Sequence, residues 1–464
     1  MAQQYQPKGY KLSEFTLLLG NDIPPNQDLS ALSFSGKAAY DMRSMCSAFN
    51  YYESVESPAI RMEFVIYDTL DLSKVMVGNE YIKIRLTADA SPNDELEVIQ
   101  KVFKIGEVTK SERAQTYILY TVSPDAIYNE SNRVFAGFQD VPGDQIVKDI
   151  QTKYLKTKTK TDRWESSRGN FNFVAPSWRP YDCISYIQDK ILGGTTNRPG
   201  YLYFETYKGK NFCTMDYLCS SNNPSFNNPK KFSYVQANVG GGFNAYNIEN
   251  INYPDRSNHL EKMRSGLYSN VVYGILLPAL TNGNLPSNGQ TRETGSKENA
   301  AGGSINPPVN MGVNTVWNFA NKLNPINPLL RVNKEYFDEN RPTRIKIRAL
   351  PGMKDSSVSV NAIGSAGNMD FDTVTAAAYS SSRWQMLNLY QLTITIAGNT
   401  GIVAGDIVDI AIPSSRSASS QTGRLELDNM YSGKYMVVGL KHMYTAEKLE
   451  THLQLAKDSL LDKE

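Results

Sequence analysis

Histidine, cysteine and long apolar runs are scarce in this chain. Of its 464 residues only 3 are histidine and 4 are cysteine, and the net charge is +1. No apolar run approaches the roughly twenty residues that a membrane span needs, so we expect no stable membrane insertion. The opening residues MAQQYQPKGYKLSEF lack the basic-then-apolar pattern of a secretory signal. The balanced charge argues against a nucleic-acid-binding protein, which usually carries a strong basic excess.

The four cysteines, Cys46, Cys183, Cys213 and Cys219, have no metal-like spacing. Cys213 and Cys219 lie six residues apart, which is not a CxxC pair. We therefore expect buried free thiols and folding in an intracellular compartment.

The three histidines, His259, His442 and His452, do not form a recognisable metal site. His442 and His452 fall in the two strands of a closing hairpin and could face each other, but no third ligand is near in sequence, so ordinary strand residues are favoured. HExxH, GxSxG and an evident Cys–His nucleophile pair are absent. VGGGF at Val239–Phe243 is not GxGxxG and has no helix pattern after it. The sequence thus predicts no catalytic residue, no cofactor, no metal and no enzyme.

Charged clusters receive a similarly plain interpretation. Ser91–Glu97 reads as a solvated hairpin tip, and a glycosidase-type carboxylate pair cannot be recognised from sequence because its separation is spatial. The basic run Lys153–Arg163 would place Lys156, Lys158 and Lys160 along one strand face. A charged edge or solvated loop is favoured there over a surface for an anionic partner.

Aromatic residues and length are the abundant features. The chain is long enough for two to four domains. It contains 28 Tyr, 17 Phe and 4 Trp. Tyr combines an apolar body with a polar tip, so this composition suits both an interface-rich protein and ordinary Tyr-rich strand faces. These two interpretations stay open.

Short strands and turns fill both ends of the chain. From Lys11 to Ser123 strands recur about every ten residues, which suggests a barrel or sandwich. In Tyr390–Ser415, apolar positions alternate with others and predict two strands with one buried face; these positions are Leu392, Ile394, Ile396, Val408, Ile410 and Ile412. The apolar window Val271–Leu280 predicts a buried strand.

Between these ends the pattern is mixed. Asp140–Leu155 and Ser177–Leu192 show helical periodicity, the second starting near Pro180 and ending before Gly193. A hairpin turning at Lys208 and Gly209 follows. Thr281–Asn314 is rich in Gly, Asn, Ser and Pro and predicts an insertion or long loop.

Three pairs of segments repeat in the same order. VGNEYIKIRL (77–86) resembles VAGDIVDIAI (403–412), VFKIGEV (102–108) resembles YMVVGLK (435–441), and TYILYTVSPD (116–125) resembles THLQLAKDSL (451–460). The separation from Gly106 to Leu119 is 13 residues, and from Gly439 to Leu453 it is 14. The common order and near-equal spacing favour a duplicated barrel. We expect the structural and interface positions to include the glycines that permit bends or bulges and four strand-face residues: Gly78, Gly106, Gly405, Gly439, Ile394, Ile396, Val408 and Ile410.

These patterns predict a mainly β fold with an α+β part. Two similar small tube-type β-barrels are expected, at residues 1–123 and at 225–280 together with 385–464. A small α+β domain is expected at 124–224, and an outer, insertion-bearing domain at 281–384.

The order and texture of these segments resemble the central baseplate hub protein of contractile-tailed bacteriophages and the related hub part of type VI secretion spike proteins. The matching stretches are GNEYIKIRL, APSWRPYDCISYIQDKIL, YLYFETYKGKNF and GDIVDIAI with the hairpin GKYMVVGLKHMYTAEKLETHLQL. None of them is a catalytic motif. Residues 281–314 and much of 332–382 fall outside the resemblance.

The resemblance implies a homotrimeric ring of pseudo-six-fold symmetry that joins a six-fold tail tube to a three-fold spike. The implied partners are the central spike protein, the tail tube or its initiator, the baseplate wedge proteins, and phage DNA that passes through the lumen without specific binding. The implied location is the tail baseplate of the virion, with assembly in the host cytoplasm. Because phosphate contacts would retard DNA, we expect the lumen to avoid positive charge.

Two other functions stay open. A tail-associated glycan-binding or cell-wall-degrading protein would also be β-rich and aromatic-rich, with exposed aromatics clustered in a groove. The equivalent hub of a bacterial contractile injection machine would obey the same physics with another cargo.

Overall fold

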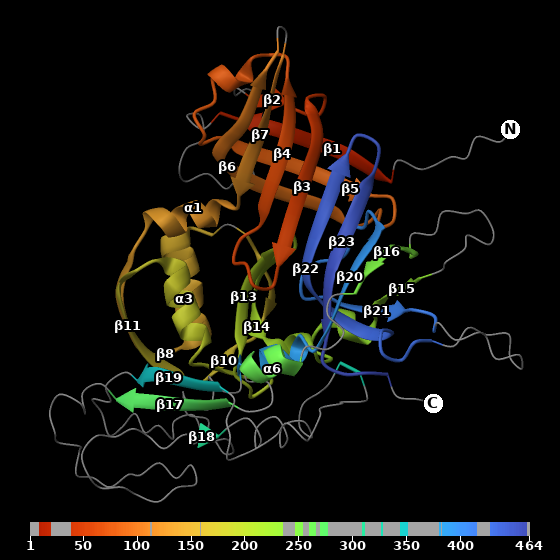
Figure 1. The fold of residues 1–464 in the computed structure, drawn as a ribbon. Helices are drawn as coiled ribbons and strands as arrows, with labels where there is room; N and C mark the ends of the chain where they lie inside the picture. The colour runs from red at the N-terminus through yellow and green to blue at the C-terminus, as the bar shows by residue number, and fades with distance from the viewer. Residues whose placement is uncertain are drawn as a thin grey trace, which may run out of the picture.

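The computed structural model is dominated by one large curled sheet (Figure 1). The structure describes residues 9–19, 39–111, 114–157, 159–234, 246–253, 259–265, 270–276, 309–310, 326–327, 344–350, 380–381, 383–414 and 427–461. Thirteen strands make up the main sheet: β1 (Tyr10–Leu18), β2 (Ala39–Asp41), β3 (Cys46–Ser54), β4 (Arg61–Asp68), β5 (Tyr81–Ala88), β6 (Glu95–Lys110), β7 (Gln115–Val122), β15 (Lys230–Ser233), β16 (Ile248–Asn252), β20 (Tyr390–Ala397), β21 (Ile407–Ala411), β22 (Gly433–Thr445) and β23 (Leu449–Lys457).

The strand order joins the two ends of the chain. It runs β16-β20-β23-β22-β3-β4-β7-β6-β5-β1-β2, and β21 lies between β22 and β15. The pair β15–β21 is parallel, and the other pairs of this sheet are antiparallel. The prediction of a mainly β fold is confirmed, as are the two strands within 390–415.

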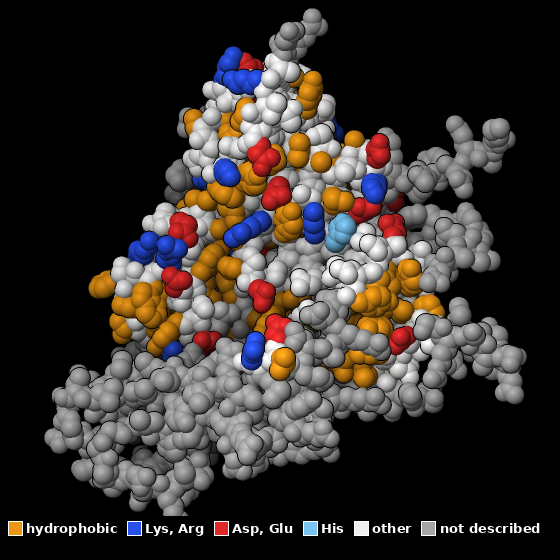
Figure 2. Space-filling view, in the orientation of Figure 1, with side chains coloured by type: hydrophobic (Ala, Val, Ile, Leu, Met, Phe, Trp, Pro, Cys, Tyr) orange, Lys and Arg blue, Asp and Glu red, His pale blue; other side chains and the backbone are white. Residues whose placement is uncertain are grey.

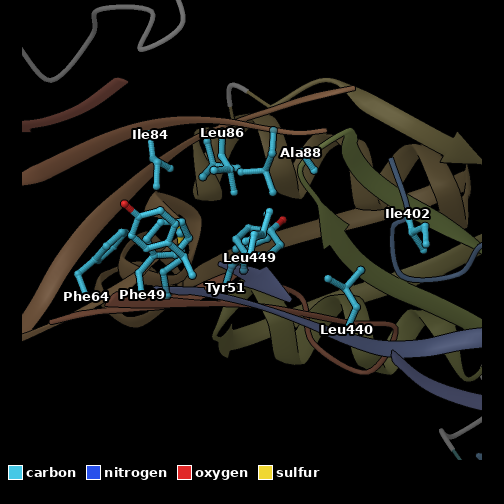
Figure 3. Packing of buried hydrophobic residues seen from close by; sticks show 14 of the residues in the cluster. Phe49, Tyr51, Phe64, Ile84, Leu86, Ala88, Ile402, Leu440 and Leu449 are labelled. Carbon is cyan, nitrogen blue, oxygen red and sulfur yellow. The ribbon is translucent and has the colours of Figure 1, made fainter. Parts of the chain in front are cut away.

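A single hydrophobic core fills the interior of this sheet. Alternate residues of β4 point inward: Met62, Phe64 and Ile66 are at most 1% exposed. The Phe64 ring stacks on Phe15 with centroids 4.9 Å apart, and Figure 3 shows it packed beside Phe49. Leucines of β22 and β23 belong to the same cluster. Each such fully buried side chain stabilises the fold by roughly 1.5–3 kcal/mol, which is why the alternation fixes the strand faces.

A smaller α+β part follows β7 along the chain and lies below the first strands in the view of Figure 1. Its elements are α1 (Pro124–Ser131), β8 (Val134–Pro142), α2 (Gly143–Ile150), the π-helical turn η4 (Gln151–Leu155), β9 (Thr161–Trp164), β10 (Ser167–Arg168), β11 (Asn170–Trp178), α3 (Pro180–Gln188), β12 (Leu192–Gly193), β13 (Tyr201–Thr206), β14 (Gly209–Thr214), α4 (Met215–Leu218) and α5 (Pro224–Asn227). The 3₁₀ turn η3 (Leu72–Lys74) lies between β4 and β5.

Both predicted helices and the predicted hairpin are present in this part. The isoleucines of α2 and α3 pack against each other in a second core. The close approach of the helices explains Gly143, because a Cβ there would lie 2.6 Å from a methyl carbon of Ile191. One expectation is wrong: Lys156 and Lys160 do not share a strand, since Lys156 ends η4 in the left-handed region and β9 begins only at Thr161. Lys158 lies outside the described residues.

A separate small sheet occupies the outer part of the chain. It consists of β17 (Asn270–Leu276), β18 (Val309–Asn310) and β19 (Arg344–Leu350), and the helix α6 (His259–Ser265) lies near it. The strand expected in the apolar window is thus present at β17, which pairs with β18 and β19 and not with the main sheet. Val239–Phe243 lies outside the described residues. The predicted insertion 281–314 also lies outside them, apart from the two residues of β18.

Candidate assembly interface: a duplicated sheet unit

Two sets of five strands follow the same path through the main sheet. In chain order, the first set is β3, β4, β5, β6 and β7, and its neighbours run β5-β6-β7-β4-β3. The second set is β16, β20, β21, β22 and β23, and its neighbours run β21-β22-β23-β20-β16. Strand by strand the two paths are identical, which supports the duplication. We call these sets the first unit and the second unit.

The first irregularity in the pairing recurs at the same place in both units. Between β3 and β4 the register shifts between Cys46 and Ala48. Between β16 and β20 it shifts between Ile248 and Asn250. Bulges of this kind bend a strand at a defined position. A bulge at the same position in both units therefore supports the duplication without relying on sequence similarity.

A second irregularity also recurs. The pair β6–β7 shifts between Val102 and Lys104, and the pair β22–β23 shifts between Val437 and Gly439. Lys104 is therefore the counterpart of Gly439.

The expected match of Gly106 with Gly439 is displaced by two residues. Gly106 instead borders a further register shift, between Gly106 and Thr109, that the second unit lacks. Glu107 in that shift has a φ of 54°. The extra shift makes this stretch one residue longer in the first unit, since Lys104 and Thr109 are five positions apart and their counterparts Gly439 and Met443 are four apart. Near-equal spacing along the chain therefore does not identify equivalent residues.

The turn before the third strand of each unit explains the repeated V…G…acid pattern. In the first unit, the Glu80 carboxylate accepts hydrogen bonds from the backbone N–H groups of Val77 (2.6 Å), Gly78 (3.0 Å) and Asn79 (2.9 Å). The Glu80 carbonyl accepts a bond from the Val102 N–H at 2.8 Å. Gly78 adopts a φ of 84°, which favours glycine.

The second unit builds the same turn with an aspartate. The Asp406 carboxylate accepts the Val403 N–H at 3.1 Å, and its carbonyl accepts the Val437 N–H at 2.8 Å. Gly405 has a φ of 83°, close to that of Gly78, but Gly405 directly precedes Asp406 whereas Gly78 stands two residues before Glu80. An acidic residue in this turn thus ties down backbone N–H groups that would otherwise be unpaired in both units.

The four apolar candidates lie inside the second unit. Ile394, Ile396, Val408 and Ile410 are each at most 1% exposed and belong to the main core. They hold the second unit together from within.

The two units meet edge to edge at β3 and β22. Residues Gly439–Thr445 pair antiparallel with Ala48–Ser54. On the buried face of this junction Phe49 stacks on Tyr444 with centroids 4.5 Å apart, and Tyr51 lies on His442 at 5.5 Å. Such aromatic cross-strand pairs add roughly 0.2–1 kcal/mol each to a sheet.

A buried carboxylate ties the junction to its surroundings. Glu53 accepts hydrogen bonds from the Tyr51 hydroxyl, from the Tyr207 N–H (2.8 Å) and from the Ala404 N–H (2.9 Å). Burial raises the pKa of Glu53 to about 7, although these bonds oppose the rise. One side chain of the first unit therefore contacts the α+β part and the turn of the second unit.

Buried charged side chains join the α+β part to both units. Lys210 donates to the Pro58 carbonyl, between β3 and β4 of the first unit, at 3.2 Å. Its ion pairs lie within the α+β part itself. Lys210 contacts Asp125 at 2.9 Å and Glu205 at 3.1 Å. Burial alone would lower the pKa of Lys210, but these two carboxylates raise it well above the ordinary value. Arg163 donates to the Ala404 carbonyl at 3.1 Å next to the turn of the second unit.

A third anchor lies at the end of β23. Arg383 contacts Asp216 at 2.9 Å and Asp458 at 3.0 Å, and is 2% exposed. Arg383 could not be identified from the sequence, because its partners Asp216 and Asp458 lie 167 and 75 positions away along the chain.

The two hairpin histidines do not face each other. His442 pairs across the hairpin with Thr451, whereas His452 pairs with Lys441, so the two rings point to opposite faces of the sheet. The His442 Nδ1 lies 2.9 Å from the Thr451 hydroxyl, and burial lowers the pKa of this histidine to about 3. Among the residues that the structure describes, no group of three or more potential ligands could hold a metal ion.

The prediction of buried free cysteines is confirmed at all four positions. Burial raises the pKa of Cys46, Cys183 and Cys219 to about 12, so these thiols are unreactive at neutral pH. Within the described part of the chain, no helix is long and apolar enough to cross a membrane.

Comparisons with known proteins agree with this architecture. No protein-family model and no curated protein matches the chain. Among solved structures it is similar to the tail protein from Neisseria meningitidis MC58, with a TM-score of 0.50, 10% identity and 97% of each chain covered. The 43 kDa tail protein of prophage MuSo2 from Shewanella oneidensis gives a TM-score of 0.49 at 8% identity, covering 96% of this chain and 99% of that one. A chain of the half-lidded PdpA–VgrG complex of Francisella gives 0.45 at 8% identity, covering 98% of this chain and 60% of that one. The likeness to the Neisseria protein shows a shared fold: the chain has the fold of that tail protein over nearly its whole length.

Proposed function

We propose that this protein is a structural hub of a contractile-tail baseplate and not an enzyme. The observation that carries the proposal is the pair of units with one connectivity and matching bulges, joined edge to edge within one chain. A protein that repeats one unit twice presents six units when three copies close into a ring. Such a ring matches a six-fold tube on one face and a three-fold spike on the other.

In this proposal the ring acts as an adaptor that joins a six-fold partner to a three-fold partner. The upper face of the ring seats the tail tube or its initiator, and the lower face holds the central spike, with wedge proteins outside. Contraction drives the spike into the cell envelope and releases it, which leaves a channel for phage DNA. The tail-protein fold and the two-unit sheet support this function, and the work of the protein is to hold symmetry-matched surfaces in place.

Mass in solution tests the proposal. The chain is purified and measured by light scattering after size exclusion, alone and with the candidate spike. A particle near three times 51.8 kDa, about 155 kDa, is expected. A monomer that becomes a trimer only on the spike also supports the hub, with the spike as template. A monomer under both conditions contradicts it, and a glycan-directed function would then be tested by turnover of cell-wall material.

A further inference from the structure

One edge of β22 serves two partners in succession. The first part of β22, Gly433–Met436, pairs with β21, and the second part, Gly439–Thr445, pairs with β3. The opposite edge of β22 pairs with β23 along its length. The second half of β22 is thus paired on both edges, with β23 on one edge and β3 on the other.

The counterpart of β22 in the first unit is β6, and its second half is covered on one side only. Glu95–Lys101 pairs with β5 and Lys101–Lys110 pairs with β7. Beyond Lys101, the edge that β5 occupies has no strand partner within the described residues. By the matching bulges, the stretch Lys104–Lys110 corresponds to the half of β22 that β3 covers.

The counterpart of β3 is β16, and it lies at the end of the sheet. One edge of β16 pairs with β20, and the other edge of Ile248–Asn252 has no strand partner in the described part of the chain. Only the preceding Asn247 bridges to Ser233. Figure 1 shows β6 and β16 on opposite sides of the molecule, so one chain cannot join them to each other.

Exposed apolar side chains mark both free edges. On β6, Val108 is 49% exposed. Next to β16, Tyr253 is 43% exposed and its ring lies 4.5 Å from that of Tyr431. Figure 2 shows hydrophobic side chains gathered on the surface near β16 and β21. Unpaired, partly apolar strand edges are normally covered or protected by charge, because they recruit other strands.

We propose that the free edge of β6 at Lys104–Lys110 pairs antiparallel with β16 of a second copy, as β22 pairs with β3 inside one chain. This inference rests on the proposed assembly and names the contact that builds it. The partner is a second copy because the molecule itself shows what covers the equivalent edge. The two edges differ, so the contact is head to tail, and each copy offers one of each, as ring closure requires.

The internal junction also gives the register. In the first unit, Thr116 of β7 faces Thr109 of β6. In the second unit, the counterpart of Thr116 is Glu450 of β23, which faces Met443 of β22. Thr109 therefore corresponds to Met443. Met443 faces Asn50 across the internal junction. The counterpart of Asn50 is Asn252. We therefore expect Thr109 of one copy to lie opposite Asn252 of the next.

Cysteine cross-linking tests this pair directly. The four native cysteines are buried, so introduced surface thiols react selectively. Mixing the single variants Thr109→Cys and Asn252→Cys and oxidising the mixture should give a covalent dimer, because facing strand residues lie within disulfide reach. The double variant should give a ladder that stops at three. A double variant of Thr109→Cys with Thr152→Cys, an exposed site on η4, is the control and should not link copies.

A second test uses association strength. Val108→Asp places a charge in the proposed contact and should weaken self-association about tenfold or more, measured by light scattering over a dilution series. Val174→Asp, on the 73% exposed Val174 of β11, is the matched control and should leave association unchanged.

The outcomes separate this inference from the proposed function. A particle of trimer mass that forms no Thr109–Asn252 link and tolerates Val108→Asp would overturn the edge contact and leave the hub intact. A link ladder that continues past three would overturn closure into a ring. A protein that stays monomeric even with the spike would overturn the hub itself and the contact with it.

Discussion

His442 shows how burial controls the charge of a single residue at the junction. Its ring is 0% exposed and its pKa is lowered to about 3 by burial, from an ordinary value of 6.5. Because the folded pKa lies below the unfolded one, its contribution to stability is present above pH 6.5 and is lost as the pH falls toward 3. The slope is on the order of 1.4 kcal/mol for each pH unit in that window.

Replacing this ring should therefore flatten the acid response. We expect His442→Phe to lose less free energy of unfolding than wild type between pH 7 and pH 4, whatever its stability at pH 7. Urea denaturation at several pH values measures this. His452→Phe is the control, since His452 is partly exposed and should change the slope less. Equal slopes for wild type and His442→Phe would contradict the account.

Lys210 is a buried cation between two carboxylates of the α+β part and also donates to the Pro58 carbonyl of the first unit. Lys210→Met would leave the buried carboxylates of Asp125 and Glu205 facing each other without a cation. Breaking a buried pair in this way costs about 3–5 kcal/mol. Chemical denaturation should show that loss, whereas Lys153→Met, which breaks an exposed pair with Asp149, should leave the free energy of unfolding close to that of wild type. A loss below about 1 kcal/mol for Lys210→Met would show that these ion pairs do not stabilise the α+β part.

At the scale of elements, the two equivalent turns have unequal surroundings. Gly78 and Gly405 have nearly the same positive φ, but a Cβ at Gly78 would meet nothing within 4 Å. A Cβ at Gly405 would lie 2.9 Å from an Arg163 nitrogen and 3.1 Å from the Phe204 ring. The second turn is packed against the α+β part, and the first is open.

Alanine at these two glycines should therefore have unequal costs. Gly78→Ala should destabilise the protein by about 1–2 kcal/mol, the price of a left-handed backbone with a side chain. Gly405→Ala should cost about 1–3 kcal/mol more, because overpacking is added. Thermal and urea unfolding of the two variants measure the difference. Equal losses would mean that the packing around Gly405 yields freely.

The strands and helices could be predicted from local periodicity, and their long-range pairing could not. The alternation in β20 and β21 marks their buried faces, and Pro180 with the isoleucines after it marks α3. The repeat was visible as sequence similarity, but its alignment failed at Gly106, where an extra register shift leaves no mark in composition. The β3–β22 junction and Glu53 join residues hundreds of positions apart, and only the folded chain reveals them.

At the scale of the whole molecule, the proposed passage of DNA restricts the charge of the lumen. Phosphate contacts bind DNA in a salt-sensitive way, and a lumen that bound it would slow ejection. We therefore expect the assembled ring to give no gel shift with double-stranded DNA at about 50 mM salt. A shift that fades steeply toward about 200 mM salt would show accessible Lys and Arg contacts with DNA and would contradict passage without binding.

The symmetry of the assembled particle tests the central claim most directly. Electron microscopy of the particle, viewed along its axis, should give class averages with three-fold symmetry and six similar lobes around one opening, because each chain contributes two units of one connectivity. Two-fold particles, open chains of subunits, or a ring with any other number of lobes would contradict the account.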